Sequence, residues 1–188
     1  MKHLAILSIG ALALIASLSP ANTSPLLANS PKPTDVALDF QRQPQFQFYL
    51  KAEKKIVQLN HPRKQYVIWQ GLQGDAIVQR GDVIRYIVTG KNNSGRSLKY
   101  LVVTQPIPKH TIYILNSVAV KNNEAKLTYS IDNGRSFVEK PIVRVKLANG
   151  RIETHSAPAA LYTHLRWNYS KLISPAAVVN TTFLVKVG

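Results

Sequence analysis

The chain has 188 residues, no cysteine and a formal net charge of +15, from 24 lysines and arginines against 9 acidic residues. The lack of cysteine excludes disulfides, cysteine-ligated zinc and thiol nucleophiles. The charge is typical of proteins that contact phosphate, anionic polysaccharide or an acidic membrane surface, the alternative being that it only keeps the chain dispersed. Because the cations are scattered singly, we expect no nucleic-acid partner.

The N-terminal segment, residues 1–21, has the three parts of a secretory signal peptide. A basic start at Lys2 precedes an apolar stretch from Leu4 to Leu18, and the small residues Ser19 and Ala21 follow. The stretch of about 15 residues is shorter than the roughly 20 that span a bilayer as a helix. We therefore expect export to the periplasm, cell surface or extracellular space, with no stable transmembrane span after cleavage. Retention as an uncleaved anchor is the alternative.

Residues 22–45 are rich in proline, serine and asparagine. Proline removes backbone donors and fixes φ, so this composition sustains neither a helix nor a sheet. The segment is predicted to be a disordered linker that separates the signal peptide from a folded domain over residues 46–188.

That domain reads as a series of short strands separated by turns. Residues 46–59 alternate loosely and carry charge, as an edge strand or a strand pair does. A period of 2 recurs along the chain, whereas no segment after the signal has the apolar stripe of a helix. The pattern predicts an all-β fold, an antiparallel Ig-like β-sandwich of about seven to nine strands. The predicted core residues are Ile84, Tyr86, Val88, Leu101, Val103, Tyr113, Val143, Val145, Leu165, Trp167, Phe183 and Val185.

The segment VVTQPIPKHTIYILNS, residues 102–117, is predicted to be a corner between two strands. Pro106 and Pro108 lack amide hydrogens, so they end one strand before Thr111 begins the next. A proline-reading partner would need a different spacing and an exposed extended flank.

Residues 81–117, GDVIRYIVTGKNNSGRSLKYLVVTQPIPKHTIYILNS, resemble the DUF11 family of Ig-like surface domains. The downstream segments YSIDNGRSF and YTHLRWNYSKLISPAAVVNTTFLVKV look like those of cyanobacterial exported proteins, so that the resemblance covers about residues 75–188, in a single copy. The chain departs from the family pattern at Gln105, where the family often has aspartate, and at His110, where it often has glycine. The resemblance implies an Ig-like fold and a surface location, without a particular activity. The residues that carry the pattern are Gly81, Asp82, Tyr86, Pro106, Pro108, Tyr113 and Trp167.

A search for catalytic, cofactor and metal motifs selects no residue, so we expect a protein that is not an enzyme and binds no cofactor or metal. His155 and His164 with Glu153 are the nearest approach to a metal site, but two surface histidines are the favoured interpretation. Asp132-Asn133-Gly134 predicts a hairpin turn rather than a calcium loop, because further carboxylates at alternate positions are missing.

Two functions remain open from the sequence. The first is a non-enzymatic module of the cell envelope or surface that contacts anionic polysaccharide or an acidic protein partner through basic outer faces. The second is a subunit or assembly factor whose exposed strand at residues 46–59 pairs with another chain by β-augmentation. Tyr66 and Trp69 are the better aromatic candidates for exposure, although packing on the edge of the sandwich is the favoured interpretation. The candidate anion contacts are Arg85, Lys99, Arg144, Lys146, Arg166 and Lys186.

Overall fold

The computed structural model describes residues 4–8, 15–19, 46–60, 64–121 and 124–188. Within these residues the chain is all β and antiparallel, with one 3₁₀ turn, η1, at Ala159–Leu161. The predicted all-β antiparallel sandwich is therefore confirmed. The predicted linker at residues 22–45 lies outside the described residues.

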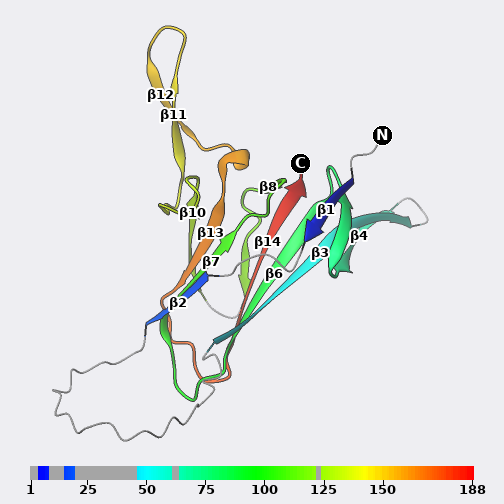
Figure 1. Cartoon of the computed structure of the whole chain (residues 1–188), viewed down its shortest axis with the longest axis vertical. Helices are drawn as coiled ribbons and strands as arrows, with labels where there is room; N and C mark the ends of the chain where they lie inside the picture. The colour runs from blue at the N-terminus through cyan, green and yellow to red at the C-terminus, as the bar shows by residue number, and fades with distance from the viewer. Residues whose placement is uncertain (1–3, 9–14, 20–45, 61–63, 122–123) are drawn as a thin grey trace, which may run out of the picture.

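Two sheets form the body of the sandwich (Figure 1). We call them the large sheet and the small sheet. The large sheet has the order β4-β3-β6-β14-β8, and β9 also pairs with β14. Its strands are β3 (Phe46–Asn60), β4 (Lys64–Leu72), β6 (Val83–Asn92), β8 (Thr111–Tyr113), β9 (Ala119–Lys121) and β14 (Val178–Val187).

The small sheet has the order β10-β13-β7-β2. Two further pairs, β1 with β5 and β11 with β12, bring the strands above the predicted number. β1 and β2 fall in the predicted signal peptide, which stays a prediction. The bounds are β1 (Leu4–Ser8), β2 (Ile15–Ser19), β5 (Asp75–Gln79), β7 (Lys99–Pro106), β10 (Lys126–Ser130), β11 (Ile142–Lys146), β12 (Ile152–Ser156) and β13 (His164–Tyr169).

The core lies between the large and small sheets. Alternate residues of β6, β13 and β14 are buried, so each strand turns one face inward. Tyr86 stacks on Phe183 with ring centroids 5.2 Å apart, and Trp167 lies 6.2 Å from the same ring. All predicted core residues are buried except two in β11, Val143 and Val145.

Val143 and Val145 were wrongly predicted to be core residues because β11 does not join either sheet. β11 pairs only with β12, and this hairpin projects from the sandwich (Figure 1). Val145 is 41% exposed as a result. The alternation of apolar and basic residues in β11 predicts one buried face. In the structure this face belongs to a two-stranded hairpin, and no other sheet packs against it.

The corner between β7 and β8 is as predicted. β7 ends at Pro106, and Thr111 begins β8 with its amide and hydroxyl both donating to the Pro108 carbonyl. His110 has φ +60°, the left-handed region that glycine tolerates better. Its carbonyl accepts a hydrogen bond from Gly188, which ties the corner to the end of β14.

The residues that carry the family resemblance lie in turns or in the hydrophobic core. Gly81 has φ +91°, and the Asp82 carboxylate accepts a 2.7 Å hydrogen bond from the Gln79 amide. Tyr86 and Tyr113 are buried in the core beside Trp167 and its neighbours. Their roles are structural.

Candidate anion-binding face

The six candidate anion contacts do not gather on one surface. Arg85 in β6 and Lys186 in β14 point outward from the large sheet, whereas Arg166 in β13 points outward from the small sheet. The other candidates lie on the projecting hairpin, Arg144 and Lys146, and at the start of β7, Lys99.

Arg166 is engaged within the fold. Its guanidinium lies 3.4 Å from the Phe137 ring centroid, and its Nε donates a 3.0 Å hydrogen bond to Thr104 Oγ1. Burial lowers the pKa of Arg166 below its ordinary value. Because these contacts fix the side chain, Arg166 is a poorer anion contact than an extended surface lysine.

The strand register brings three further lysines to the outer face of the large sheet. Paired residues of neighbouring strands point to the same side, and Tyr86 and Val88 point inward, so their sequence neighbours point outward. Lys51 pairs with Ile87. Lys121 pairs with Asn180, on the same outer face. We name this surface the basic face, with the cations Lys51, Arg85, Lys91, Lys121 and Lys186.

One carboxylate opposes these cations among the described residues of the face. Arg85 donates to Glu53 from both Nε and Nη2, and its guanidinium lies 4.1 Å from the Trp69 ring centroid. Lys51 Nζ is 4.0 Å from the same carboxylate. No ion pair of the described residues involves Lys91, Lys121 or Lys186, so their charges are available to a ligand.

A polar row crosses the middle of the basic face. Tyr49 in β3 pairs with Thr89 in β6, which pairs with Asn180 in β14, which pairs with Lys121 in β9. Asn180 Nδ2 donates a 3.2 Å hydrogen bond to Thr89 Oγ1, and Tyr49 is 53% exposed. With strands spaced about 4.8 Å apart, the row extends over roughly 14 Å. An exposed aromatic ring beside polar and basic groups is suited to contact a sugar chain.

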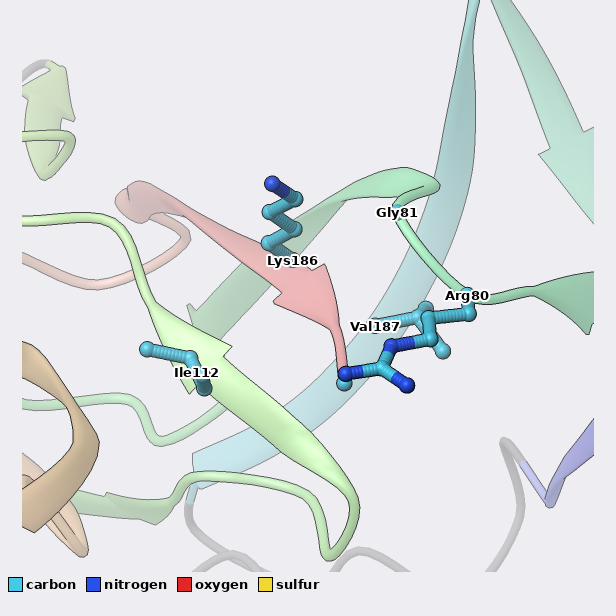
Figure 2. Close-up of a pocket in the computed structure, with 6 residues that line it drawn as sticks. Arg80, Gly81, Ile112, Lys186 and Val187 are labelled. Carbon is cyan, nitrogen blue, oxygen red and sulfur yellow. The ribbon is translucent and has the colours of Figure 1, made fainter.

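A pocket of about 350 Å³ lies where the basic face meets the turn between β5 and β6 (Figure 2). Ile112 and Val187 give it apolar walls, and Arg80 and Lys186 give it charge. Figure 2 shows the Arg80 and Lys186 side chains extending in different directions, so they do not converge on one point. The pocket therefore lacks the geometry of a tight two-cation site. Gly81 and Gly188 complete its lining.

The sequence missed Lys51, Lys91 and Lys121, because their common side depends on pairing across β3, β6, β14 and β9. Tyr66, for which packing on the edge of the sandwich is the favoured interpretation from the sequence, is 42% exposed. Trp69 is half-buried beneath Arg85.

The residues considered for a metal site do not assemble one. His155 Nε2 lies 3.3 Å from Glu153 Oε2 on the projecting hairpin, whereas His164 in β13 contacts Thr163 and Phe137. In the part of the chain that the structure describes, no group of three potential metal ligands occurs.

The turn at Asp132 is a hairpin-type turn, in line with its prediction. Asn133 and Gly134 have φ values of +58° and +82°. The Asp132 carboxylate accepts hydrogen bonds from the Ser130 hydroxyl and from the amide and hydroxyl of Ser136. These bonds lower the pKa of Asp132 well below its ordinary range. The carboxylate is thus occupied in closing the turn.

None of the described residues forms a helix long and apolar enough to cross a membrane. Comparison of the chain with protein-family models, with curated proteins and with solved structures finds no match.

Proposed function

We propose that the protein is a non-enzymatic binding module, exported to the cell envelope or surface, that binds an anionic polysaccharide through the basic face. The single observation that carries the proposal is the strand register, which collects Lys51, Lys91, Lys121 and Lys186 around Arg85 on one sheet face. Only Glu53 opposes them among the described residues of that face. An extended polymer with regularly spaced charges suits a flat face better than a small ligand does, since small ligands favour concave sites.

The choice of a glycan over an acidic protein rests on the polar row beside the lysines. Tyr49 offers an exposed ring for the apolar face of a sugar, and Thr89 and Asn180 offer hydroxyl and amide groups. An acidic protein partner would use the charges without requiring the ring. Export and the DUF11 assignment belong to the same proposal and rest on the signal pattern and the motif at residues 81–117.

The proposal is tested by affinity measurements against dextran sulfate and neutral dextran. We expect binding to the sulfated polymer alone, and weaker binding as salt rises, because exposed charge contacts are screened. Affinity that stays constant from low to high salt would exclude an electrostatic face.

A matched pair of variants locates the site. Changing Lys51, Lys91, Lys121 and Lys186 together to serine removes four contacts of roughly 0.5 kcal/mol each, which is about thirtyfold in Kd. The control changes Arg135, Lys140, Arg144 and Lys146 to serine, which removes the same charge from the region of the projecting hairpin. If the control loses as much affinity as the first variant, the basic face is not the site.

A second pair of variants tests whether the polar row contributes to polysaccharide binding. Tyr49→Ser should weaken binding to an anionic polysaccharide while leaving its salt dependence unchanged. Tyr100→Ser removes another exposed ring, at 62% exposure, from the small-sheet side of the molecule. Equal effects of the two changes would argue against the polar row.

The alternative function, β-augmentation along residues 46–59, has less support. β3 pairs with β6 over Phe46–Lys54 and with β4 over Ala52–Asn60, so among the described residues its open edges are two short ones on opposite sides of the strand, over residues 46–51 and 55–60. One partner strand therefore cannot pair with β3 along its whole length. The exposed strand at this side of the large sheet is β4.

A further inference from the structure

The hairpin formed by β3 and β4 extends beyond the sandwich as a two-stranded ribbon. β6 accompanies β3 only as far as Lys54, whereas β4 pairs with β3 up to Asn60. The ribbon exposes large apolar side chains on both of its faces, from 40% of Ile68 to 71% of Leu59. Two strands alone are marginal in water, and clustered exposed apolar residues mark interaction surfaces. The exposed apolar residues are Val57, Leu59, Tyr66, Val67 and Ile68.

After Lys64, the outer edge of β4 carries none of the features that protect edge strands from pairing. Its segment from Gln65 to Leu72 contains no charged residue and no proline. Its register with β3 runs without a bulge. In the described part of the chain no strand pairs with this edge. Natural sheets usually guard such an edge with lysine, proline or a bulge, so an unguarded edge indicates a pairing surface.

We propose that two copies of the chain associate by antiparallel pairing of β4 with β4, around a two-fold axis at Ile68. Ile68 is the midpoint of β4, so this register pairs the strand along its whole length. Each Ile68 then faces its counterpart, Val67 faces Trp69, and Lys64 faces Leu72. No charge meets a like charge at the seam.

The register also extends the apolar rows of the ribbon across the seam. Ile56 pairs with Ile68 within one chain, so the two copies together align four isoleucines on one face. On the other face, Val57 pairs with Val67, which meets Trp69 of the second copy. Directly opposed apolar side chains are the unit that stabilises antiparallel pairs. The same patch serves both copies, as a two-fold interface requires.

A second copy fits this edge better than a charged partner does. Between Gln65 and Leu72 the edge offers no counter-charge to an acidic peptide or a polyanion. The second copy supplies the apolar and amide side chains that the edge itself presents, with Tyr66 opposite Gln70. The net charge of +15 on each copy opposes association, so screening by salt should strengthen the dimer.

The dimer would also place both basic faces on the same side of one continuous sheet, because directly paired residues of antiparallel strands share a face. A long polyanion could then engage two faces at once, with a gain in avidity. The dimer does not depend on that binding, and a monomer would retain its own basic face.

Sedimentation velocity of the exported, purified protein in low and high salt tests the proposal. We expect a monomer–dimer equilibrium that shifts toward the dimer as salt rises, opposite to the trend for polyanion binding. Ile68→Lys places two lysines face to face and should raise the dimer Kd at least tenfold. Leu59→Lys changes an exposed apolar residue of β3, away from the seam, and should leave the dimer intact. A protein that is monomeric in both salts, or equal effects of the two variants, would overturn the proposal.

Cross-linking gives a positive readout that does not depend on losing the dimer. The chain has no cysteine, so Ile68→Cys introduces a single thiol that meets its own counterpart across the seam. Directly opposed residues of antiparallel strands lie about 4.5–5.5 Å apart at Cα, which a disulfide can bridge. Mild oxidation should yield a covalent dimer from Ile68→Cys and little from Leu59→Cys. Equal cross-linking of the two variants counts against this register.

Discussion

At the scale of single residues, Asn92 ties two distant segments of the chain together. It is fully buried, and its Nδ2 donates to the carbonyls of Arg96, Ile173 and Ser174. Its Oδ1 accepts from the amide and hydroxyl of Ser94. Each of these carbonyls also accepts a hydrogen bond from another donor, namely Ser94 Oγ, the Leu98 amide and the Ala177 amide respectively, so Asn92 adds a second bond to each and links the two segments.

Asn92→Ala should lower the free energy of unfolding by about 3 kcal/mol, since it removes all the hydrogen bonds of a fully buried amide side chain and leaves a cavity in its place. Its neighbour Asn93 is exposed, with one hydrogen bond to Gln47, and Asn93→Ala should cost about 0.5 kcal/mol or less. Urea unfolding of the two variants checks the difference. A similar loss in both would show that the buried hydrogen bonds contribute little.

His164 makes the stability of the fold sensitive to mild acid. Burial lowers its pKa below the ordinary value, Arg166 lowers it further, and Asp132 acts in the opposite direction. The unfolded chain, with an ordinary histidine pKa near 6.5, thus binds a proton at a higher pH than the folded chain does. The linked contribution to stability is present above pH 6.5 and is lost as the pH falls toward the folded pKa.

His164→Gln should therefore flatten the fall in stability between pH 7.5 and pH 5. The measurement is the free energy of unfolding in urea at several pH values for both proteins. Parallel pH profiles would mean that other groups produce the acid sensitivity.

At the scale of elements, alternation predicted which strands exist and which side of each is apolar, but not what each strand meets. β6, β13 and β14 were predicted with their inward residues, because they lie within the sandwich where one face must be buried. β11 has the same pattern and stands apart, since its partner is only β12. Alternation with a period of 2 shows that one face of a strand is apolar. Whether another sheet covers that face depends on long-range strand pairing, which the alternation does not contain.

A valine-to-alanine substitution in each strand measures the difference in burial between β14 and β11. Val185 is fully buried in β14, so Val185→Ala should cost about 2 kcal/mol through lost contacts and a cavity. Val145→Ala, on the projecting hairpin, should cost about 0.5 kcal/mol or less. The two midpoints in urea give the comparison, and a large cost at Val145 would mean that the hairpin packs on the body in solution.

At the scale of the whole molecule, the candidate site is a consequence of register. The outward orientation of Arg85 and Lys186 could be predicted from the sequence, because each alternates with apolar residues that face inward in its own strand. Lys51, Lys91 and Lys121 join them only because β3, β6, β14 and β9 align as they do. No local pattern contains that alignment, and the three lysines are far apart in the sequence.

Polyanion binding at this face should stabilise the fold as a whole. A ligand at 100 times its Kd adds about 2.7 kcal/mol to the folded state if it does not bind the unfolded chain. Dextran sulfate should raise Tm for the wild-type protein and leave it nearly unchanged for the variant with four serines on the basic face. Equal shifts in both proteins would place the binding elsewhere.

The hairpin of β11 and β12 offers a position for labelling and controlled cleavage. Its turn at Asn149 and Gly150 is exposed and remote from the sandwich core (Figure 1). Exposed loop tips tolerate inserted sequence and are preferred by proteases. A short epitope tag or a protease recognition sequence placed there would report where the protein resides on intact cells, without touching the basic face or β4.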